Sequence, residues 1–408
     1  MHTAPGTDAL ATHLHHSVSV VSPGDTGTFL NDMWRFDYTS SGWERVTFAN
    51  RSIVSCPASG QLNINTQMPD IRAGLEMVGV GATSIMCGGY KINSAGHWLW
   101  SKDASGSCDC WWFTPLPEPR WDALKLVSGS AMPAPRHSGL MVVGLDKQPP
   151  NYPRLLIIGG QGEGESVLGD CWFLETSSSD APAIFGATYS WKKCDVAKGE
   201  LTMPGRFGHG GVFFRGDVYV FGGFASDGLG GKMAMRDMWR LTNFESSSRK
   251  WVEVMPSSSG PTARAFHSMW LTGSKLILHG GQASEGTGLA SVVSDTWSFD
   301  LFSQVWTLYG STSDLPVVSH MLTASATDVA SIAFGGKSPS GVSSARLYKF
   351  DSQTSWSRCE HFSSIPPFLA PFLSFPVNMY VRTYVRTYMH INVCGLNCGH
   401  DMPCQTFF

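Results

Sequence analysis

The stretch RFGHGGVFFRGDVYVFGG at residues 206–223, followed by RDMWRL at 236–241 and RKWVEV at 249–254, contains the pattern that decides the fold. Its apolar and β-branched residues form short runs separated by turn residues, a pattern that predicts four short strands. Gly222 and Gly223 end the second run, where the backbone must turn or approach another segment without a Cβ atom. Trp239 and Trp251 stand in the third and fourth runs, and their size predicts a large buried face.

The same order of features recurs along the chain, so this segment is one copy of an internal repeat. Each complete copy has an apolar run that ends in two glycines, followed by aromatic residues in the third and fourth strands. The glycines are Gly88, Gly89, Gly159, Gly160, Gly222, Gly223, Gly280, Gly281, Gly335 and Gly336. The aromatic residues are Trp100, then Trp111 and Trp112, Trp172, Trp191, Trp239, Trp251, Trp297, Trp306, Tyr348 and Trp356. Five complete copies in register make the repeat a strong signal.

A partial copy precedes the five complete ones. It has the run SVSVV at residues 17–21, Ser22 and Pro23 in place of the glycine pair, and Trp34 and Trp43 in its last two strands. We therefore expect an incomplete sixth unit at the N-terminal end of the repeat region.

Stacking of the units is the expected way to bury them, because one four-stranded sheet cannot cover both of its faces alone. A closed ring also hides the strand edges. The order of apolar run, glycine pair, tryptophan and second tryptophan resembles the kelch family over residues 17–357. The resemblance implies an all-β fold, a kelch-type β-propeller at residues 17–360 with six four-stranded blades, five complete and one incomplete.

The composition agrees with many strands and turns around an aromatic core, with 44 Gly, 23 Pro and 15 Trp but only 15% charged residues. The formal net charge of −3 argues against nucleic acid as a partner, because such binding relies on many Lys and Arg contacts to phosphates. No apolar run is long enough to cross a bilayer. Residues 1–16 lack the pattern of a signal peptide and are expected to form a disordered extension.

Residues 361–408 break the repeat. They contain PPFLAPFLSFP at 366–376 and the tandem YVRTYVRTY at 380–388, which predict a low-complexity tail that is disordered or a non-native extension. The alternative is that residues 377–385 supply the missing first strand of the partial unit and close the ring.

The ten cysteines do not predict a dense disulfide framework in a chain of this length. Cys87 lies in an apolar run and is interpreted as a small hydrophobic residue. Cys108 and Cys110 are interpreted as an ordinary pair in a loop. These features favour a reducing, cytoplasmic location over secretion.

A metal site is not expected. The tail residues Cys394, Cys398, His400 and Cys404 are crowded, with spacings unlike the two tight ligand pairs of structural zinc sites. We therefore predict no metal and no cofactor.

An arginine starts the first strand in four copies, at Arg72, Arg136, Arg206 and Arg264. The first strand of a propeller blade is the innermost, so these residues are expected at one mouth of the central channel. Four guanidinium groups there would form a positive focus for an acidic ligand. The alternative interpretation is that each arginine pairs with a neighbouring loop carboxylate or carbonyl group.

The loops between second and third strands are polar and differ in length, so we expect binding residues in them. They span residues 90–97, 161–170, 224–237, 282–295 and 337–345. The predicted function is a scaffold that binds a protein or peptide and is not an enzyme. The alternative is a propeller enzyme that resembles copper-radical oxidases or specifier-type iron proteins, whose convergent ligand sets we do not find in the sequence.

Overall fold

The structure is a computed structural model of the 408-residue chain. It describes residues 14–16, 33–37, 42–45, 69, 72, 74–80, 83–92, 98–102, 108–114, 119–145, 153–176, 188–196, 199–244, 248–283, 291–311, 321–324, 330–334, 347–351 and 355–358. Within these residues the secondary structure is almost entirely β, and the helical part is a single 3-10 turn, η1 (Glu163–Glu165).

Six main antiparallel sheets follow one another along the chain. Sheet 1 contains β1 (Leu14–His16), β2 (Met33–Asp37) and β3 (Gly42–Arg45). Sheet 2 contains β4 (Glu76–Val80), β5 (Thr83–Cys87), β8 (Cys110–Thr114) and β9 (Arg120–Ala123). Sheet 3 contains β10 (Leu140–Leu145), β11 (Pro153–Gln161), β12 (Val167–Thr176) and β13 (Tyr189–Lys193).

The remaining three main sheets have the same strand order. Sheet 4 contains β14 (Gly210–Phe214), β15 (Asp217–Phe221), β18 (Met238–Thr242) and β19 (Lys250–Val254). Sheet 5 contains β21 (Ser268–Thr272), β22 (Lys275–His279), β25 (Asp295–Asp300) and β26 (Trp306–Ser311). Sheet 6 contains β27 (Met321–Ala324), β28 (Ala330–Phe334), β29 (Leu347–Asp351) and β30 (Trp356–Arg358).

Short hairpins extend from the main sheets between their second and third strands. They are β6 (Tyr90–Ile92) with β7 (Trp98–Trp100), β16 (Phe224–Ser226) with β17 (Lys232–Ala234), and β23 (Gln282–Ala283) with β24 (Ser291–Val292), which β20 (Arg264–Ala265) joins. In sheet 3, β11 and β12 themselves extend past the sheet and enclose η1. Four of the loops predicted from the sequence therefore contain strands or a 3-10 turn, and we call these four segments the inserts. The fifth, at residues 337–345, lies outside the described residues.

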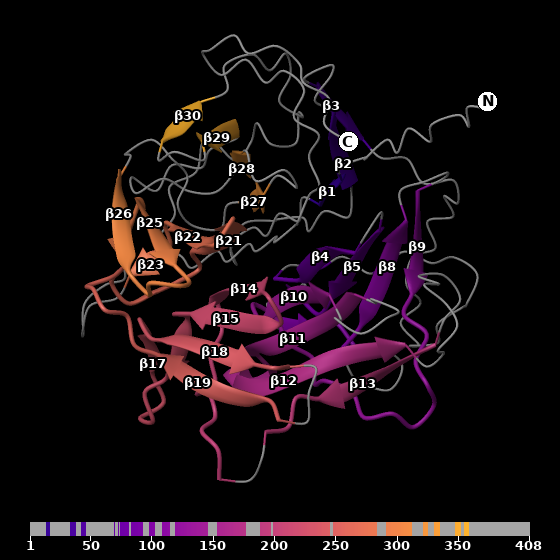
Figure 1. Cartoon of the computed structure of the whole chain (residues 1–408). Helices are drawn as coiled ribbons and strands as arrows, with labels where there is room; N and C mark the ends of the chain where they lie inside the picture. The colour runs from indigo at the N-terminus through magenta and orange to yellow at the C-terminus, as the bar shows by residue number, and fades with distance from the viewer. Residues whose placement is uncertain are drawn as a thin grey trace, which may run out of the picture.

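The sheets stack side by side around a common interior. The first strands of consecutive sheets contact one another in the order β4, β10, β14, β21 and β27. Figure 1 shows them on the inner side, with the fourth strands β9, β13, β19 and β26 on the outside. This arrangement confirms the predicted all-β, propeller-type fold. The closure of the ring and the number of its blades stay predictions.

The apolar core lies between neighbouring sheets. One buried cluster joins sheets 2 and 3 through Trp112, Trp172 and Trp191, and the next joins sheets 3 and 4 through Trp239 and Trp251. Two further clusters join sheet 4 to sheet 5 and sheet 5 to sheet 6. Large indole rings thus fill the space between sheets, as the sequence pattern predicted.

In sheet 4, the glycine pair that ends the second strand is required by close backbone approach. Gly222 and Gly223 have φ angles of 62° and 95°. A Cβ atom on Gly222 would lie 2.5 Å from the carbonyl oxygen of Arg264, and one on Gly223 would lie 2.8 Å from Cβ of His209. The amide of Gly223 also donates to the Arg264 carbonyl at 2.8 Å. The pair therefore lets neighbouring units meet backbone to backbone.

Two assignments within the repeat were wrong. Trp100 belongs to β7 of an insert, whereas the third strand of sheet 2 is β8, which contains Trp111 and Trp112. The fourth-strand residue is Trp121 in β9, which is buried and packs against Phe113. The insert contains a tryptophan-rich strand of its own, so the predicted third and fourth strands were each placed one strand too early in the sequence.

The N-terminal extension also differs from the prediction. Leu14–His16 form β1 and pair with β2, although residues 1–16 were expected to be disordered. Trp34 and Trp43 lie in β2 and β3, as predicted. The run at residues 17–21, Ser22 and Pro23 lie outside the described residues, as do Gly335, Gly336 and the whole tail at 361–408 with its cysteines.

Candidate functional site

Each recurrent arginine reaches an aspartate at the start of the third strand of its own unit. The pairs are Arg72 with Asp109, Arg136 with Asp170, Arg206 with Asp237 and Arg264 with Asp295. We call each pair, with the groups around it, a clasp. It joins the segment before the first strand to the edge of the third strand.

The clasp of sheet 4 shows the complete form. Arg206 donates from Nη1 and Nη2 to both oxygens of Asp237 at 2.8 Å, and from Nη1 to the carbonyl of Gly222 at 3.0 Å. Its Nε donates to the carbonyl of Pro204 at 3.2 Å. The indole Nε1 of Trp239 donates to the same carboxylate at 2.6 Å.

Sheets 3 and 5 repeat these contacts. In both, the arginine binds the aspartate through two nitrogens, and Trp172 or Trp297 donates to that aspartate at 2.7 Å. Arg136 also donates to the Gly159 carbonyl, and Arg264 to the Gly280 carbonyl. Bidentate charge-assisted pairs of this kind are among the strongest hydrogen bonds in proteins.

Burial of the arginines contradicts the hypothesis of an open positive focus. The side chains of Arg72, Arg136, Arg206 and Arg264 are between 0% and 3% exposed. Every one of them already binds a carboxylate of the same unit. The alternative interpretation, in which each arginine pairs with a neighbouring carboxylate and carbonyl, describes the structure.

The aspartates of the complete clasps are held in their charged form. Burial by itself would raise their pKa, but hydrogen bonds and the positive charge of the paired arginine outweigh it. The pKa values of Asp170, Asp237 and Asp295 are therefore lowered from the ordinary value of 3.8. The clasps are ion pairs at neutral pH.

A chain of backbone hydrogen bonds connects consecutive units two residues after each arginine. Ser138 N donates to Gly74 O, Gly208 N to Ser138 O, and Phe266 N to Gly208 O, at 2.6 to 3.2 Å. All four residues have φ angles between 52° and 65°. The repeated left-handed residue thus ties neighbouring units to one another beside the clasps.

Ion pairs connect the inserts of three neighbouring sheets. Lys102, just after β7, pairs with Glu163 of η1, and Lys232 of β17 pairs with Glu165 at the other end of the same turn. Since these side chains are partly exposed, each pair contributes little stability on its own. Together they place the inserts of sheets 2, 3 and 4 next to one another on one face.

The hairpin of β16 and β17 presents an apolar residue at its tip. One oxygen of Asp227 accepts hydrogen bonds from the amides of Leu229 and Gly231, both at 2.8 Å, and the Asp227 amide donates to the Gly231 carbonyl. The side chain of Leu229 is 94% exposed, and Met233 of β17 is 49% exposed. The loop is therefore an ordered support for an exposed leucine.

Two disulfides correct the predictions about cysteine. Cys87 and Cys110 lie opposite each other in β5 and β8 and form one disulfide, and Cys171 and Cys194 form the other. Cys87 is therefore not an unpaired hydrophobic residue, and Cys110 is not one of an ordinary loop pair. Cys108 is a buried thiol, and burial raises its pKa to about 11.

The described residues contain no group of three or more His, Cys, Asp or Glu side chains arranged to hold a metal ion. In the same part of the chain, no helix has the length and hydropathy needed to span a bilayer.

The chain belongs to the kelch-repeat family. The family model described as the KLHDC2/KLHL20/DRC7 Kelch-repeats domain matches residues 74–336 and 183–377, together more than half of the chain.

Three proteins of Oryza sativa subsp. japonica are similar to parts of the chain. Adagio-like protein 3 is 31% identical over 150 residues, which is 36% of this chain and 20% of that protein. Putative adagio-like protein 2 is 28% identical over 157 residues, covering 38% and 21%. The tRNA wybutosine-synthesizing protein 2/3/4 is 30% identical over 135 residues, covering 33% and 10%. The chain thus spans about a fifth or less of each relative.

The sequence contains a signal for the aspartates that the sequence-based prediction did not use. Asp109, Asp170, Asp237 and Asp295 each stand two residues before a third-strand tryptophan. The same spacing identifies Trp111, and not Trp100, as the third-strand residue of sheet 2.

Proposed function

We propose that this kelch chain is a scaffold that binds a protein or peptide on the face formed by the inserts of sheets 2 to 5. The exposed tip residue Leu229 carries the proposal, because its hairpin is fixed by hydrogen bonds while the leucine itself contacts little of the chain. An apolar side chain held in this way fits a pocket on a partner, as anchor residues at protein interfaces do.

The inserts also meet the requirement for a continuous surface. The ion pairs through Glu163 and Glu165 connect three inserts from three sheets, so a ligand would meet them as one unit. Membership of the kelch-repeat family supports a binding role. The acidic ligand of the sequence hypothesis has less support, since the arginines meant to receive it hold aspartates.

The proposal is tested with two leucine variants. Leu229→Asp places a charge at the hairpin tip, and Leu308→Asp is the matched control, because Leu308 is 53% exposed on the outer strand β26. In affinity capture with quantitative mass spectrometry, we expect L229D to lower the recovery of specific partners about tenfold or more. L308D should leave recovery unchanged. Equal recovery with wild type and L229D would remove the support for this surface.

The enzymatic alternative has no observation in its favour among the described residues. One relative has the name of a tRNA-modifying protein, but the match covers only a tenth of it. We therefore propose a non-catalytic role. The cytoplasmic location stays a prediction, and the two disulfides weigh against it because such bonds persist mainly in oxidising compartments.

A further inference from the structure

The clasp of sheet 2 is incomplete. Arg72 binds Asp109 through a single oxygen, Oδ2, at 2.6 Å, whereas the aspartates of sheets 3, 4 and 5 are held through both oxygens. The indole nitrogen of Trp111 is buried and has no hydrogen-bond partner within the described residues. Its counterparts in the other three sheets donate to the aspartate. Within the described residues, Asp109 therefore accepts fewer side-chain hydrogen bonds than the aspartates of the other three clasps.

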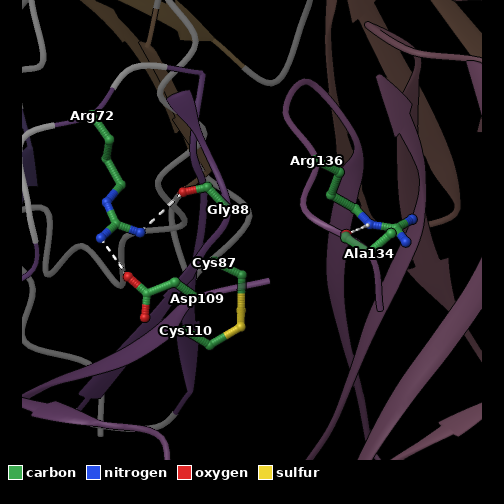
Figure 2. The surroundings of a disulfide bond; sticks show 7 residues. All are labelled: Arg72, Cys87, Gly88, Asp109, Cys110, Ala134 and Arg136. Atoms are coloured by element: carbon green, nitrogen blue, oxygen red, sulfur yellow. Dashed lines mark hydrogen bonds and ion pairs between the residues drawn. A yellow bond between two sulfur atoms is a disulfide. The ribbon is translucent and has the colours of Figure 1, made fainter. Parts of the chain in front are cut away.

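The disulfide between Cys87 and Cys110 lies at this same clasp. Cys110 follows Asp109, and Cys87 precedes Gly88, whose carbonyl accepts a hydrogen bond from Arg72 at 3.2 Å. Figure 2 shows the sulfur bridge beside the Arg72–Asp109 ion pair.

In sheets 4 and 5 the corresponding positions are not cross-linked. In sheet 3, Cys171 corresponds to Cys110, but it forms its disulfide with Cys194, and Ile158 stands opposite it in the second strand. Phe221 stands opposite Met238 in sheet 4, and His279 stands opposite Thr296 in sheet 5 with a hydrogen bond of 2.8 Å. The fold therefore does not require a covalent bond at this position. Among sheets 2 to 5, a disulfide between the second and third strands occurs only in sheet 2, beside the incomplete clasp.

The first insert depends on this region for its attachment. The hairpin of β6 and β7 follows Gly89 and returns to Asp109. At its base, Ser101 N donates to the Gly89 carbonyl at 2.9 Å, and Asp109 N donates to the Ser101 carbonyl at 3.4 Å. A loosened junction between Cys87 and Cys110 would release both ends of the insert.

We propose that the Cys87–Cys110 disulfide is a redox-sensitive device that replaces the missing clasp contacts and holds the β6–β7 insert in place. Its reduction loosens sheet 2 at the clasp and leaves sheets 3 to 5 ordered. A consequence for ligand binding rests on the proposed function, because this insert is part of the proposed face.

The redox step requires an external dithiol. One thiolate of the dithiol attacks a sulfur of the bridge, and the other cysteine leaves as a thiolate that takes up a proton. The second thiol of the reductant then displaces the first cysteine and closes the reductant's own disulfide, so two electrons pass to the protein. Cys108 is unsuited to begin this exchange, because its raised pKa leaves almost no thiolate at neutral pH.

The first experiment maps the cysteines of the full chain, purified without reductant, by peptide mass spectrometry. We expect a cross-linked peptide that contains Cys87 and Cys110, and a pair of free thiols at these positions would overturn the proposal. Hydrogen exchange then compares Cys87→Ser/Cys110→Ser with the control Cys171→Ser/Cys194→Ser, which removes a disulfide beside a complete clasp. Amides of residues 83–114 should exchange about tenfold faster or more in the first variant.

In the control, amides of residues 153–196 should change about threefold or less. Wild-type protein treated with dithiothreitol gives the same comparison within one molecule, in case a variant does not fold. Equal loosening of the two segments, or no change in residues 83–114, would overturn the proposal. The exchange is measured without any ligand, so its outcome is independent of the test of Leu229.

Discussion

Sheet 4 and sheet 6 have the same order of four strands but differ in the residues that precede their first and third strands. Sheet 4 has the complete clasp of Arg206 and Asp237. In the sequence of the last copy, Val317 and Val318 stand where the arginine is expected, and Arg346 stands two residues before Tyr348, where other copies have aspartate. Strands β27 to β30 nevertheless pair in the usual order.

The difference separates two contributions to the fold. Sheet 6 packs Tyr348 and Phe350 against Trp270 of sheet 5, so apolar stripes on paired strands are sufficient to form and stack a sheet. The clasp adds a specific link between the first and third strands. A buried ion pair of this kind contributes little net stability when intact, but it is costly to break.

The largest expected effect is that of Arg206→Ala. Removing the arginine leaves the carboxylate of Asp237 partly buried without its cation, which should lower the free energy of unfolding by about 3 to 5 kcal/mol. Arg240→Ala is the control, because Arg240 pairs with Asp217 in a more exposed setting and should cost about 1 kcal/mol or less. Urea denaturation measures both. If the two variants lose the same free energy of unfolding, the clasp of sheet 4 contributes no more than an exposed ion pair.

The next effect is that of Gly222→Ala. The substitution combines a left-handed backbone with a Cβ atom 2.5 Å from the Arg264 carbonyl oxygen, so a loss of about 3 kcal/mol is expected. Gly228→Ala has a similar φ of 76° but open space around the new Cβ atom, and should cost about 1 kcal/mol. Thermal unfolding of the two variants separates the cost of a left-handed backbone from the cost of a close contact at the new Cβ atom. If the two variants lose the same stability, the contact between neighbouring units does not require a glycine at position 222.

A smaller effect is expected for Trp239→Phe. The change removes the hydrogen bond to Asp237 along with part of the ring. Trp111→Phe removes a similar ring portion without breaking a hydrogen bond, since the Trp111 nitrogen has no hydrogen-bond partner within the described residues. W239F should therefore be less stable than W111F by about 1 to 2 kcal/mol in urea unfolding. The reverse order would contradict the contrast between complete and incomplete clasps.

The smallest expected effect concerns pH. The folded-state pKa of Asp237 lies below its ordinary value of 3.8, so its clasp stabilises the protein fully above about pH 4 and loses that contribution as the pH falls through the folded pKa. In R206A, the arginine that lowers the pKa of Asp237 is absent. The stability difference between wild type and R206A should therefore shrink as the pH falls from 7 to 3. A difference that stays constant in urea titrations over this range would show that Asp237 is not the group responsible.

Much of the fold could be predicted from the sequence because its signals are local. Alternating apolar runs, glycine pairs and spaced tryptophans each specify strand type or strand end within a few residues, and their repetition specifies stacking. The two wrong predictions also have physical reasons. Trp100 satisfied the same local pattern from within an insert, and β1 formed from Leu14–His16, a short segment with little pattern of its own.

The candidate site was predicted only in part. Arg136, Arg206 and Arg264 lie in the segments before the first strands and not at the start of those strands. Their role depended on partners 31 to 34 residues away. Whether a guanidinium group faces a ligand or an aspartate is decided by which strand ends meet in space. The disulfides pose the same difficulty, since a sequence separation of 23 residues does not by itself indicate proximity.

The sequence by itself determined the all-β repeat, its kelch membership and the places where backbone must approach backbone, because those properties depend on residue types at short spacing. Only the tertiary structure decided that the arginines are internal, that Cys87 meets Cys110, and that Leu229 stands exposed on an ordered hairpin. Burial and pairing result from the register of strands and the stacking of sheets, which bring together residues that the chain itself keeps far apart.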